Sequence, residues 1–287
     1  MWRKDKVLLA TLLVLLAAPR PAEAQRRRID VGGAAREYVV HVPGGAGAKA
    51  DALVLVLHGG GGRPEAIAAH TGFTRLAERK GFVVAYPAAL GGRWKDGRAG
   101  AEGTEDVSFL RALADTLGRR HGIPPSRRFA IGISNGAMMS YRLACDAPGT
   151  VAAIAVVAGS VHRSVLDRCE LPAPVSVVAL HGSEDRLVPL AGGGSLAPVP
   201  AALAHFGSRA GCRAPGTPDT IDRVRDRTIV VHTALAGCTG AAVELYEIRG
   251  GGHTWPGRMG GWSARFGRVS RELDATAVAW NFFDRRR

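Results

Sequence analysis

One serine stands in a pattern that favours nucleophilic chemistry. Ser134 lies within Gly132-Ile133-Ser134-Asn135-Gly136, a G-x-S-x-G sequence placed between an apolar run and a helix-like one. A nucleophile on a sharp strand-to-helix turn needs glycines two positions before and two after it, because the backbone is crowded and the serine takes a strained conformation. We therefore predict that Ser134 attacks a carbonyl carbon. The alternative is a glycine-rich turn with a passive serine.

A serine hydroxyl needs a base, and in this arrangement an acid and then a histidine follow later in the chain. Asp185 comes just after the apolar run Val175 to Leu180, and a carboxylate past the carboxyl end of a strand faces the same edge of the sheet as Ser134. We predict that Asp185 orients the histidine, with Glu184 as the near alternative. His253 is the predicted base, because three consecutive glycines before it form a flexible loop that can bring the imidazole over the serine.

Three other histidines are expected to be structural. His205 lies in a helix-like pattern and His232 within an apolar, strand-like run, where a hydrogen-bonded structural histidine is the usual explanation. His58 opens a run of four glycines and is also expected to be structural. His253 therefore remains the predicted base.

Acyl transfer also needs hydrogen-bond donors for the oxyanion of the tetrahedral intermediate. The backbone N–H of Asn135, directly after the nucleophile, is one predicted donor. The second is the amide of Gly60, in the glycine run after the apolar stretch Leu53 to Leu57, where glycines let the backbone approach a substrate carbonyl. A phosphate-binding loop is the other interpretation of these glycines, but no Lys followed by Ser or Thr supports it.

The elements that must position these residues alternate along the chain. Apolar runs and helix-like patterns follow one another, which is typical of an α/β fold with a mostly parallel, doubly wound sheet covered by helices on both faces. Residues 186 to 228 are rich in Gly, Pro and Ala and are expected to form an irregular insertion. The expected strands are Glu37 to Val42, Leu53 to Leu57, Val83 to Tyr86, Phe129 to Ile133, Ala152 to Val157, Val175 to Leu180, Ile229 to Thr233 and Val243 to Ile248; the expected helices are Glu65 to Lys80, Val107 to His121, Asn135 to Ala144 and Arg271 to Phe283.

The amino-terminal residues have the pattern of a signal peptide. A basic start precedes the apolar run Val7 to Ala18, and Ala22-Glu23-Ala24 supplies a small-x-small cleavage site. A membrane anchor is the alternative, but the run is shorter than the roughly 20 residues that span a bilayer. We expect residues 1–24 to be removed, residues 25–287 to form a single catalytic domain, and the protein to be secreted or periplasmic, with no membrane contact after cleavage.

The charge balance does not change this interpretation. The 287-residue chain has 38 Lys and Arg against 25 Asp and Glu, a formal net charge of +13. These charges are scattered, without a recognisable nucleic-acid module, so no nucleic-acid partner is expected. The oligomeric state is left open by the sequence.

Four cysteines follow the predicted cleavage site, and export would place them where disulfides persist. Three connectivities are possible, of which sequential pairing closes two loops of similar length. No pair has the close C-x-x-C spacing of a zinc site, so no metal is expected. The four residues are Cys145, Cys169, Cys212 and Cys238.

From about Glu37 to Phe283 the sequence resembles a family of exported esterases that groups polyhydroxybutyrate depolymerases with feruloyl and acetylxylan esterases. The resemblance implies an α/β-hydrolase fold, no cofactor, the triad already chosen, and pairing of Cys145 with Cys169. It also implies ester substrates such as hydroxyalkanoate oligomers or, alternatively, plant cell-wall esters. The segments that carry the resemblance are 57–60, 86–87 with 94, 105–109, 132–139, 143–145, 181–185 with 188–189, and 250–257.

Two other functions are alternatives. A serine peptidase would need a site for a charged peptide terminus, and a complete Ser, Asp and His set argues against an inactive binding module.

Two tryptophans are candidates for the walls of the acyl site. Trp255 lies two residues past the predicted base, and Trp94 lies in the loop after the strand that ends at Tyr86. Indole faces suit aromatic or repeating esters, although large aromatic side chains also pack loops without binding anything. Met138 and Met139, in contrast, are expected to pack in the core on the helix behind the nucleophile.

Overall fold

The computed structural model describes residues 24–44, 50–259 and 263–285. The predicted signal peptide therefore lies, apart from Ala24, outside the described residues. Within the described part of the chain, no helix is long and apolar enough to cross a membrane.

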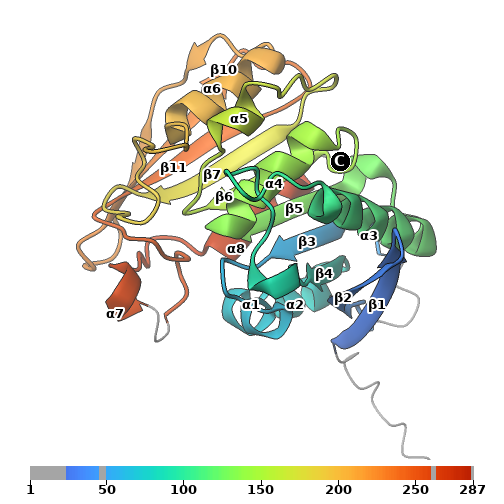
Figure 1. Ribbon diagram of the computed structural model, residues 1–287. Helices are drawn as coiled ribbons and strands as arrows, with labels where there is room; N and C mark the ends of the chain where they lie inside the picture. Colours follow the sequence, from blue (N-terminus) through green and yellow to red (C-terminus); the bar gives the residue numbers. More distant parts are fainter. Residues whose placement is uncertain (1–23, 45–49, 260–262, 286–287) are drawn as a thin grey trace, which may run out of the picture.

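Six parallel strands form the middle of one sheet (Figure 1). Five of them, β3, β4, β5, β6 and β7, are buried at every position. Continuous apolar strands of this kind occur where helices cover both faces of a parallel sheet. In spatial order the six are β4 (Val83–Pro87), β3 (Leu53–Leu57), β5 (Arg128–Ile133), β6 (Ala153–Val157), β7 (Ser176–Gly182) and β11 (Val243–Arg249).

Antiparallel strands extend the sheet at both edges. On the β4 side, β2 (Ala34–His41) and β1 (Gln25–Val31) form a hairpin. On the β11 side, β10 (Ile229–Ala236) pairs with the short strands β8 (Ala214–Pro215) and β9 (Asp219–Ile221). The sequence predicted none of the strands β1, β8 and β9, because their side chains are mostly exposed and show no apolar run.

Helices pack on both faces of the sheet and build two separate hydrophobic cores. In Figure 1, α4 crosses in front of the sheet and α8 lies behind it. The predicted α/β architecture is therefore confirmed. One core includes α3 (Glu105–His121), α4 (Asn135–Asp146) and α6 (Val199–Arg209), and the other includes α1 (Pro64–Thr71), α2 (Phe73–Lys80) and α8 (Ala275–Asp284).

Three expected elements differ from those observed. The single helix expected from Glu65 to Lys80 is two helices, because Gly72 adopts a left-handed conformation (φ 72°) that ends α1. The last helix begins at Ala275, where the Asp274 side chain accepts hydrogen bonds from two backbone amides as an N-cap. The expected irregular insertion contains α6, whose apolar side chains join the first core.

Two disulfides join distant segments. Cys145, near the end of α4, pairs with Cys169, which follows the short helix α5 (Arg163–Leu166). Cys212, after α6, pairs with Cys238, after β10. Of the three connectivities left open by the sequence, the structure has the sequential one. The disulfide of Cys145 ties α4 at the end far from Ser134.

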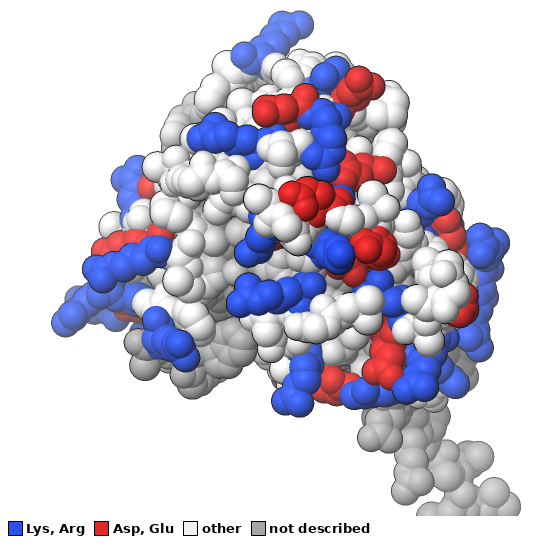
Figure 2. Space-filling model, viewed as in Figure 1, with Lys and Arg blue, Asp and Glu red and all other residues white. Residues whose placement is uncertain are grey.

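Charged side chains are dispersed over the surface. Figure 2 shows Lys and Arg spread across the face viewed in Figure 1, with Asp and Glu between them. Several form ion pairs that are at least partly exposed, such as Arg28 with Glu37 and Arg258 with Asp274. The net positive charge is therefore not gathered into one stripe on this face.

Candidate active site

Ser134 lies on the sharp turn that its glycines predict. It has φ 56° and ψ −121°, between the last residue of β5 and the first of α4. A Cβ on Gly132 would be 2.2 Å from the carbonyl carbon of Gly136, and a Cβ on Gly136 would be 2.4 Å from the carbonyl oxygen of Leu57. No larger residue fits at either glycine without movement of the backbone, so the G-x-S-x-G pattern follows from close packing.

His253 and Asp185 form a buried pair. His253 Nδ1 lies 2.7 Å from Asp185 Oδ2, and the carboxylate is completely buried. The other carboxylate oxygen, Oδ1, accepts hydrogen bonds of 2.9 Å from the amides of Leu187 and Val188. Glu184, the near alternative, has an exposed side chain. The structure thus brings Asp185, and not Glu184, to the imidazole.

The glycines before His253 allow close packing more than flexibility. A Cβ on Gly252 would be 2.4 Å from the carbonyl oxygen of Phe266, and a Cβ on Gly251 would be 2.6 Å from the side chain of Ile248. The amide of His253 also donates to the Phe266 carbonyl (2.7 Å). The expected flexible loop is instead a tightly held one, which fixes the imidazole.

Ser134 and His253 line the same cavity of about 540 Å³. Its lining combines apolar groups with four basic side chains, and none of the described lining residues is acidic. The basic residues are Arg93, Arg98, His162 and His253.

The two predicted oxyanion donors also border this cavity. Gly60 belongs to the loop after β3, in which the amide of Gly61 donates to Gly92 O (2.8 Å) and the amide of Gly62 donates to Gly59 O (2.9 Å). A Cβ on Gly59 would lie 3.7 Å from Ser134 Cβ, so the loop runs directly beside Ser134. Backbone hydrogen bonds thus hold this loop in place next to the serine.

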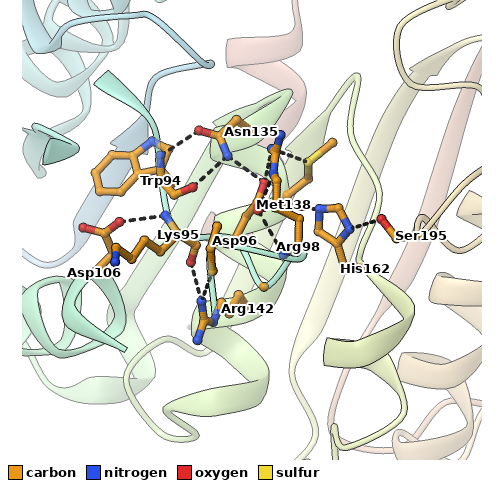
Figure 3. Close-up of polar contacts among 12 residues, drawn as sticks. Trp94, Lys95, Asp96, Arg98, Asp106, Asn135, Met138, Arg142, His162 and Ser195 are labelled. Carbon is orange, nitrogen blue, oxygen red and sulfur yellow. Dashed lines mark hydrogen bonds and ion pairs between the residues drawn. The ribbon is translucent and has the colours of Figure 1, made fainter. Parts of the chain in front are cut away.

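The side chain of Asn135 is fixed by the loop after β4 (Figure 3). Its Oδ1 accepts from the amide of Trp94 (2.8 Å), and its Nδ2 donates to Trp94 O (3.1 Å) and to Asp96 Oδ2 (2.7 Å). Asn135 is the first residue of α4, so these bonds hold the helix start against the loop. The amide that we predict to stabilise the oxyanion is thereby held in position.

Asp96 is the acidic centre of this network. Its completely buried carboxylate accepts from Arg98 Nε (2.8 Å) and Arg98 Nη2, and His162 Nε2 lies 3.6 Å away. Burial raises the pKa of the Asp96 carboxyl, but the hydrogen bonds and charge of Arg98, with the His162 ring nearby, outweigh it, and the pKa stays well below its ordinary value. Asp96 is therefore an anion at neutral pH.

The two tryptophans do not line the cavity, and their predicted binding role is wrong for this structure. Each indole is 1% exposed. Trp94 Nε1 donates to His58 O (2.9 Å), and Trp255 Nε1 donates to Thr276 Oγ1 (3.1 Å), so each polar edge is satisfied inside the protein. Both side chains pack loops together, which is the use of large aromatics that sequence alone does not separate from ligand binding.

The two methionines take different places. Met139 is completely buried in the first core, as expected. Met138, although buried, borders the cavity, and its sulfur lies 3.8 Å from Arg98 Nη2. The expectation that Met138 only packs the core is therefore incomplete.

The other histidines are held by structural contacts. His58 Nε2 accepts from the amide of Ala89 (3.2 Å), which leaves Nδ1 to donate to Gly59 O (2.8 Å). Burial lowers the pKa of His58, so the ring is neutral. His205 Nε2 donates a hydrogen bond to Cys169 O (2.8 Å), and His232 Nε2 lies 3.0 Å from Glu244 Oε2.

Sequence reasoning missed several residues of the cavity. Arg93, Arg98 and His162 have no motif of their own, because they come from loops whose positions depend on the packed structure. His162 is buried, with Nδ1 2.9 Å from Ser195 Oγ. A basic residue next to Trp94, within a segment that resembles the esterases, was the only signal available for Arg93.

A family model described as "Esterase PHB depolymerase" matches residues 36–179. A relative named "Putative esterase NocK", from Nocardia uniformis subsp. tsuyamanensis, is 31% identical over 91% of this chain and 83% of its own. The chain belongs to the esterase PHB depolymerase family. It is accordingly a carboxylic ester hydrolase, as the resemblance predicted.

Other similar proteins are also esterases by name. Feruloyl esterase C of Emericella nidulans is 31% identical over 56% of this chain, and the match spans 59% of the fungal protein. The solved structure of an acetyl xylan esterase from Aspergillus awamori superposes with a TM-score of 0.62, at 17% identity, over 80% of this chain and 94% of that one. At this identity the superposition establishes the fold alone.

Proposed function

We propose that this esterase is a serine enzyme whose triad is Ser134, His253 and Asp185. The observation that carries the proposal is the placement of Ser134 on a strained strand-to-helix turn, in one cavity with a histidine that pairs with a buried carboxylate. This is the geometry in which a hydroxyl is activated by a neighbouring base and the base is oriented by a third group.

In the proposed reaction His253 takes the proton of the Ser134 hydroxyl as Oγ attacks the ester carbonyl. The amides of Gly60 and Asn135 donate hydrogen bonds to the oxyanion. The intermediate collapses, His253 protonates the leaving alcohol, and the acyl group remains on Ser134. Water activated by the same histidine then releases the acid, while Asp185 stabilises the imidazolium that forms in each step.

For the substrate we propose soluble esters of hydroxy acids, such as short hydroxyalkanoate oligomers, with residues 25–287 acting as one catalytic domain. The family match supports this substrate class. Feruloyl or acetyl esters of plant cell walls are the second candidate, supported by the names of the fungal relatives. We also propose that the enzyme acts outside the cytoplasm, because two disulfides are characteristic of oxidising compartments.

The test is a comparison of wild type with Ser134→Ala on short-chain acyl, feruloyl and hydroxybutyrate-oligomer esters, by kcat/KM. We expect the variant to fold and to lose hydrolysis of every ester, and an organophosphate to label Ser134 in the wild type alone. Turnover by the variant at the wild-type rate contradicts the triad. The preferred ester in the wild-type panel decides between the two substrate classes.

A further inference from the structure

Of the four basic side chains that line the active-site cavity, three lie close to a carboxylate of the protein and one does not. His253 pairs with Asp185, and Arg98 pairs with Asp96 through two nitrogens. His162 is the third, with Nε2 3.6 Å from Asp96 Oδ1. Each of these side chains faces a buried carboxylate that the protein itself supplies.

Arg93 is the exception. Its side chain makes no hydrogen bond or ion pair with any residue that the structure describes, and the residue is exposed. Its backbone, in contrast, is held, because the amide of Trp94 donates to the Asn135 side chain (2.8 Å). A guanidinium without a partner on an anchored loop is available to an anion that enters the cavity.

The guanidinium of Arg93 lies close to the predicted position of the ester carbonyl. Arg93 Nη1 lies 3.3 Å, and Cζ 3.6 Å, from the point that a Cβ on Gly60 would occupy, and Asn135 Cβ lies 3.8 Å from the same point. The cation therefore stands over the loop whose amide is the predicted oxyanion donor. An anionic group bound to it would belong to the part of the substrate next to the scissile ester.

We propose that Arg93 is a specificity-determining residue that binds a free carboxylate of the ester substrate. A guanidinium presents paired N–H donors that match the two oxygens of a carboxylate. Linear esters of hydroxy acids end in such a carboxylate, whereas acetyl and feruloyl esters of sugars are uncharged near the scissile bond. The inference rests on the proposed function and narrows it to acid-terminated esters.

The test compares free acids with their uncharged primary amides. One pair, a hydroxybutyrate dimer and its terminal amide, has the charge on the alcohol side of the scissile bond. A second pair, an aryl hemisuccinate and the matching aryl succinamate, has it on the acyl side. We expect the wild type to favour the acid over the amide in one pair, and that pair tells which side of the ester lies against Arg93.

Arg93→Gln is expected to lower kcat/KM for the preferred acid by about 10- to 100-fold, mainly through KM, since a hydrogen bond to a charged group contributes about 1.5–3 kcal/mol. The amide should change far less, and Arg93→Lys should retain part of the preference. Arg209→Gln is the matched control, because Arg209 ends α6 and does not line the cavity, yet its loss changes the net charge equally.

Two results would overturn the inference. Equal losses in kcat for acid and amide in Arg93→Gln would mean that Arg93 acts on the oxyanion or on the loop, and not on a substrate carboxylate. A wild type that hydrolyses acids and amides equally well in both pairs would mean that no carboxylate is recognised. Failure of the proposed function looks different, since the wild type would then hydrolyse neither member of either pair.

Discussion

At the level of single residues, burial distinguishes the acid of the proposed triad, Asp185, from its neighbour Glu184. Asp185 Oδ1 accepts two backbone amides while Oδ2 contacts His253, so both oxygens are committed, whereas Glu184 points to solvent. Asp185→Asn preserves the size of this side chain but places an amide where the imidazole N–H must donate, which favours the wrong tautomer.

We expect Asp185→Asn to lower kcat by up to about 10⁴-fold, as for other serine triads, and Glu184→Gln to stay close to wild type. Steady-state kinetics on a chromogenic ester, with thermal unfolding of each variant, provides the measurement. A larger loss of kcat in Glu184→Gln than in Asp185→Asn would mean that Glu184, and not Asp185, is the acid that orients the histidine.

The two tryptophans show why a residue's position near a motif does not give its role. Trp255 is two residues from His253, yet its ring packs edge-on to Phe73 with a centroid distance of 6.4 Å and is buried. Phe266, which is only partly buried, borders the cavity instead.

Trp255→Ala should therefore destabilise the protein by about 3–5 kcal/mol, because it leaves a large hole in the core. The ratio of kcat/KM for bulky and acetyl esters should hardly change in the fraction that folds. Phe266→Ala is the contrasting variant, for which we expect an altered ester preference and a smaller loss of stability. Urea unfolding and a two-ester comparison measure both effects. If Trp255→Ala keeps its stability but loses a preference for bulky esters, Trp255 binds substrate as the sequence predicted.

At the level of elements, the loop after β4 and the start of α4 act as one unit. Asp96 is a positioning residue in this unit, because it contacts the Asn135 side chain and does not line the cavity. Misplacing a reacting group by about 1 Å lowers kcat strongly without weakening substrate binding to the same degree.

We expect Asp96→Asn to lower kcat by about 10- to 100-fold with a smaller change in KM. Asn135→Ala, which keeps the backbone amide, should have a similar effect. The double variant should be little worse than either single one, because both break the same contact. Asp115→Asn is the control, since Asp115 pairs with Arg128 outside the cavity. Additive losses in the double variant would separate the two residues.

The sequence predicted the elements whose packing requires particular residue types, such as apolar side chains or glycines, at particular positions. Strand β3 is one example, because it is a continuous apolar run. The turn at Ser134 is another, because its glycines stand at fixed spacing. The division at Gly72 and the exposed strand β1 have no such signal. The sequence also gave no indication that Arg93 and His162 belong to the site. They lie on separate loops that come together only when the whole sheet has formed.

At the level of the whole molecule, buried histidines should make stability depend on pH. His58 and His181 are each 1% exposed. Burial lowers the pKa of both rings below the ordinary value near 6.5, despite hydrogen bonds to backbone carbonyls and nearby acids that raise it. The unfolded chain therefore binds protons at a higher pH than the folded protein does.

The sign of the effect follows from that difference. A group whose pKa is depressed on folding stabilises the protein above its unfolded pKa, and this contribution is lost as the pH falls through the folded pKa. The free energy of unfolding should thus be constant above about pH 7.5 and decrease from there toward pH 5. Asp96, whose pKa is also lowered, extends the decrease below about pH 4.

Urea unfolding at intervals between pH 8 and pH 4.5 is the measurement, with His58→Gln and His181→Gln as variants in which the ring no longer titrates. Glutamine retains a donor for the contacts to Gly59 O and Val188 O, and each variant should have a flatter profile between pH 7 and pH 5 than the wild type, whatever its absolute stability. Titration of the histidine ring protons by NMR in the wild type gives the same answer without a substitution, since the two buried rings should gain their protons at a lower pH than an ordinary histidine does. Stability that rises as the pH falls from 7.5 to 5, or rings that gain a proton above pH 6.5, would show that burial does not control these histidines.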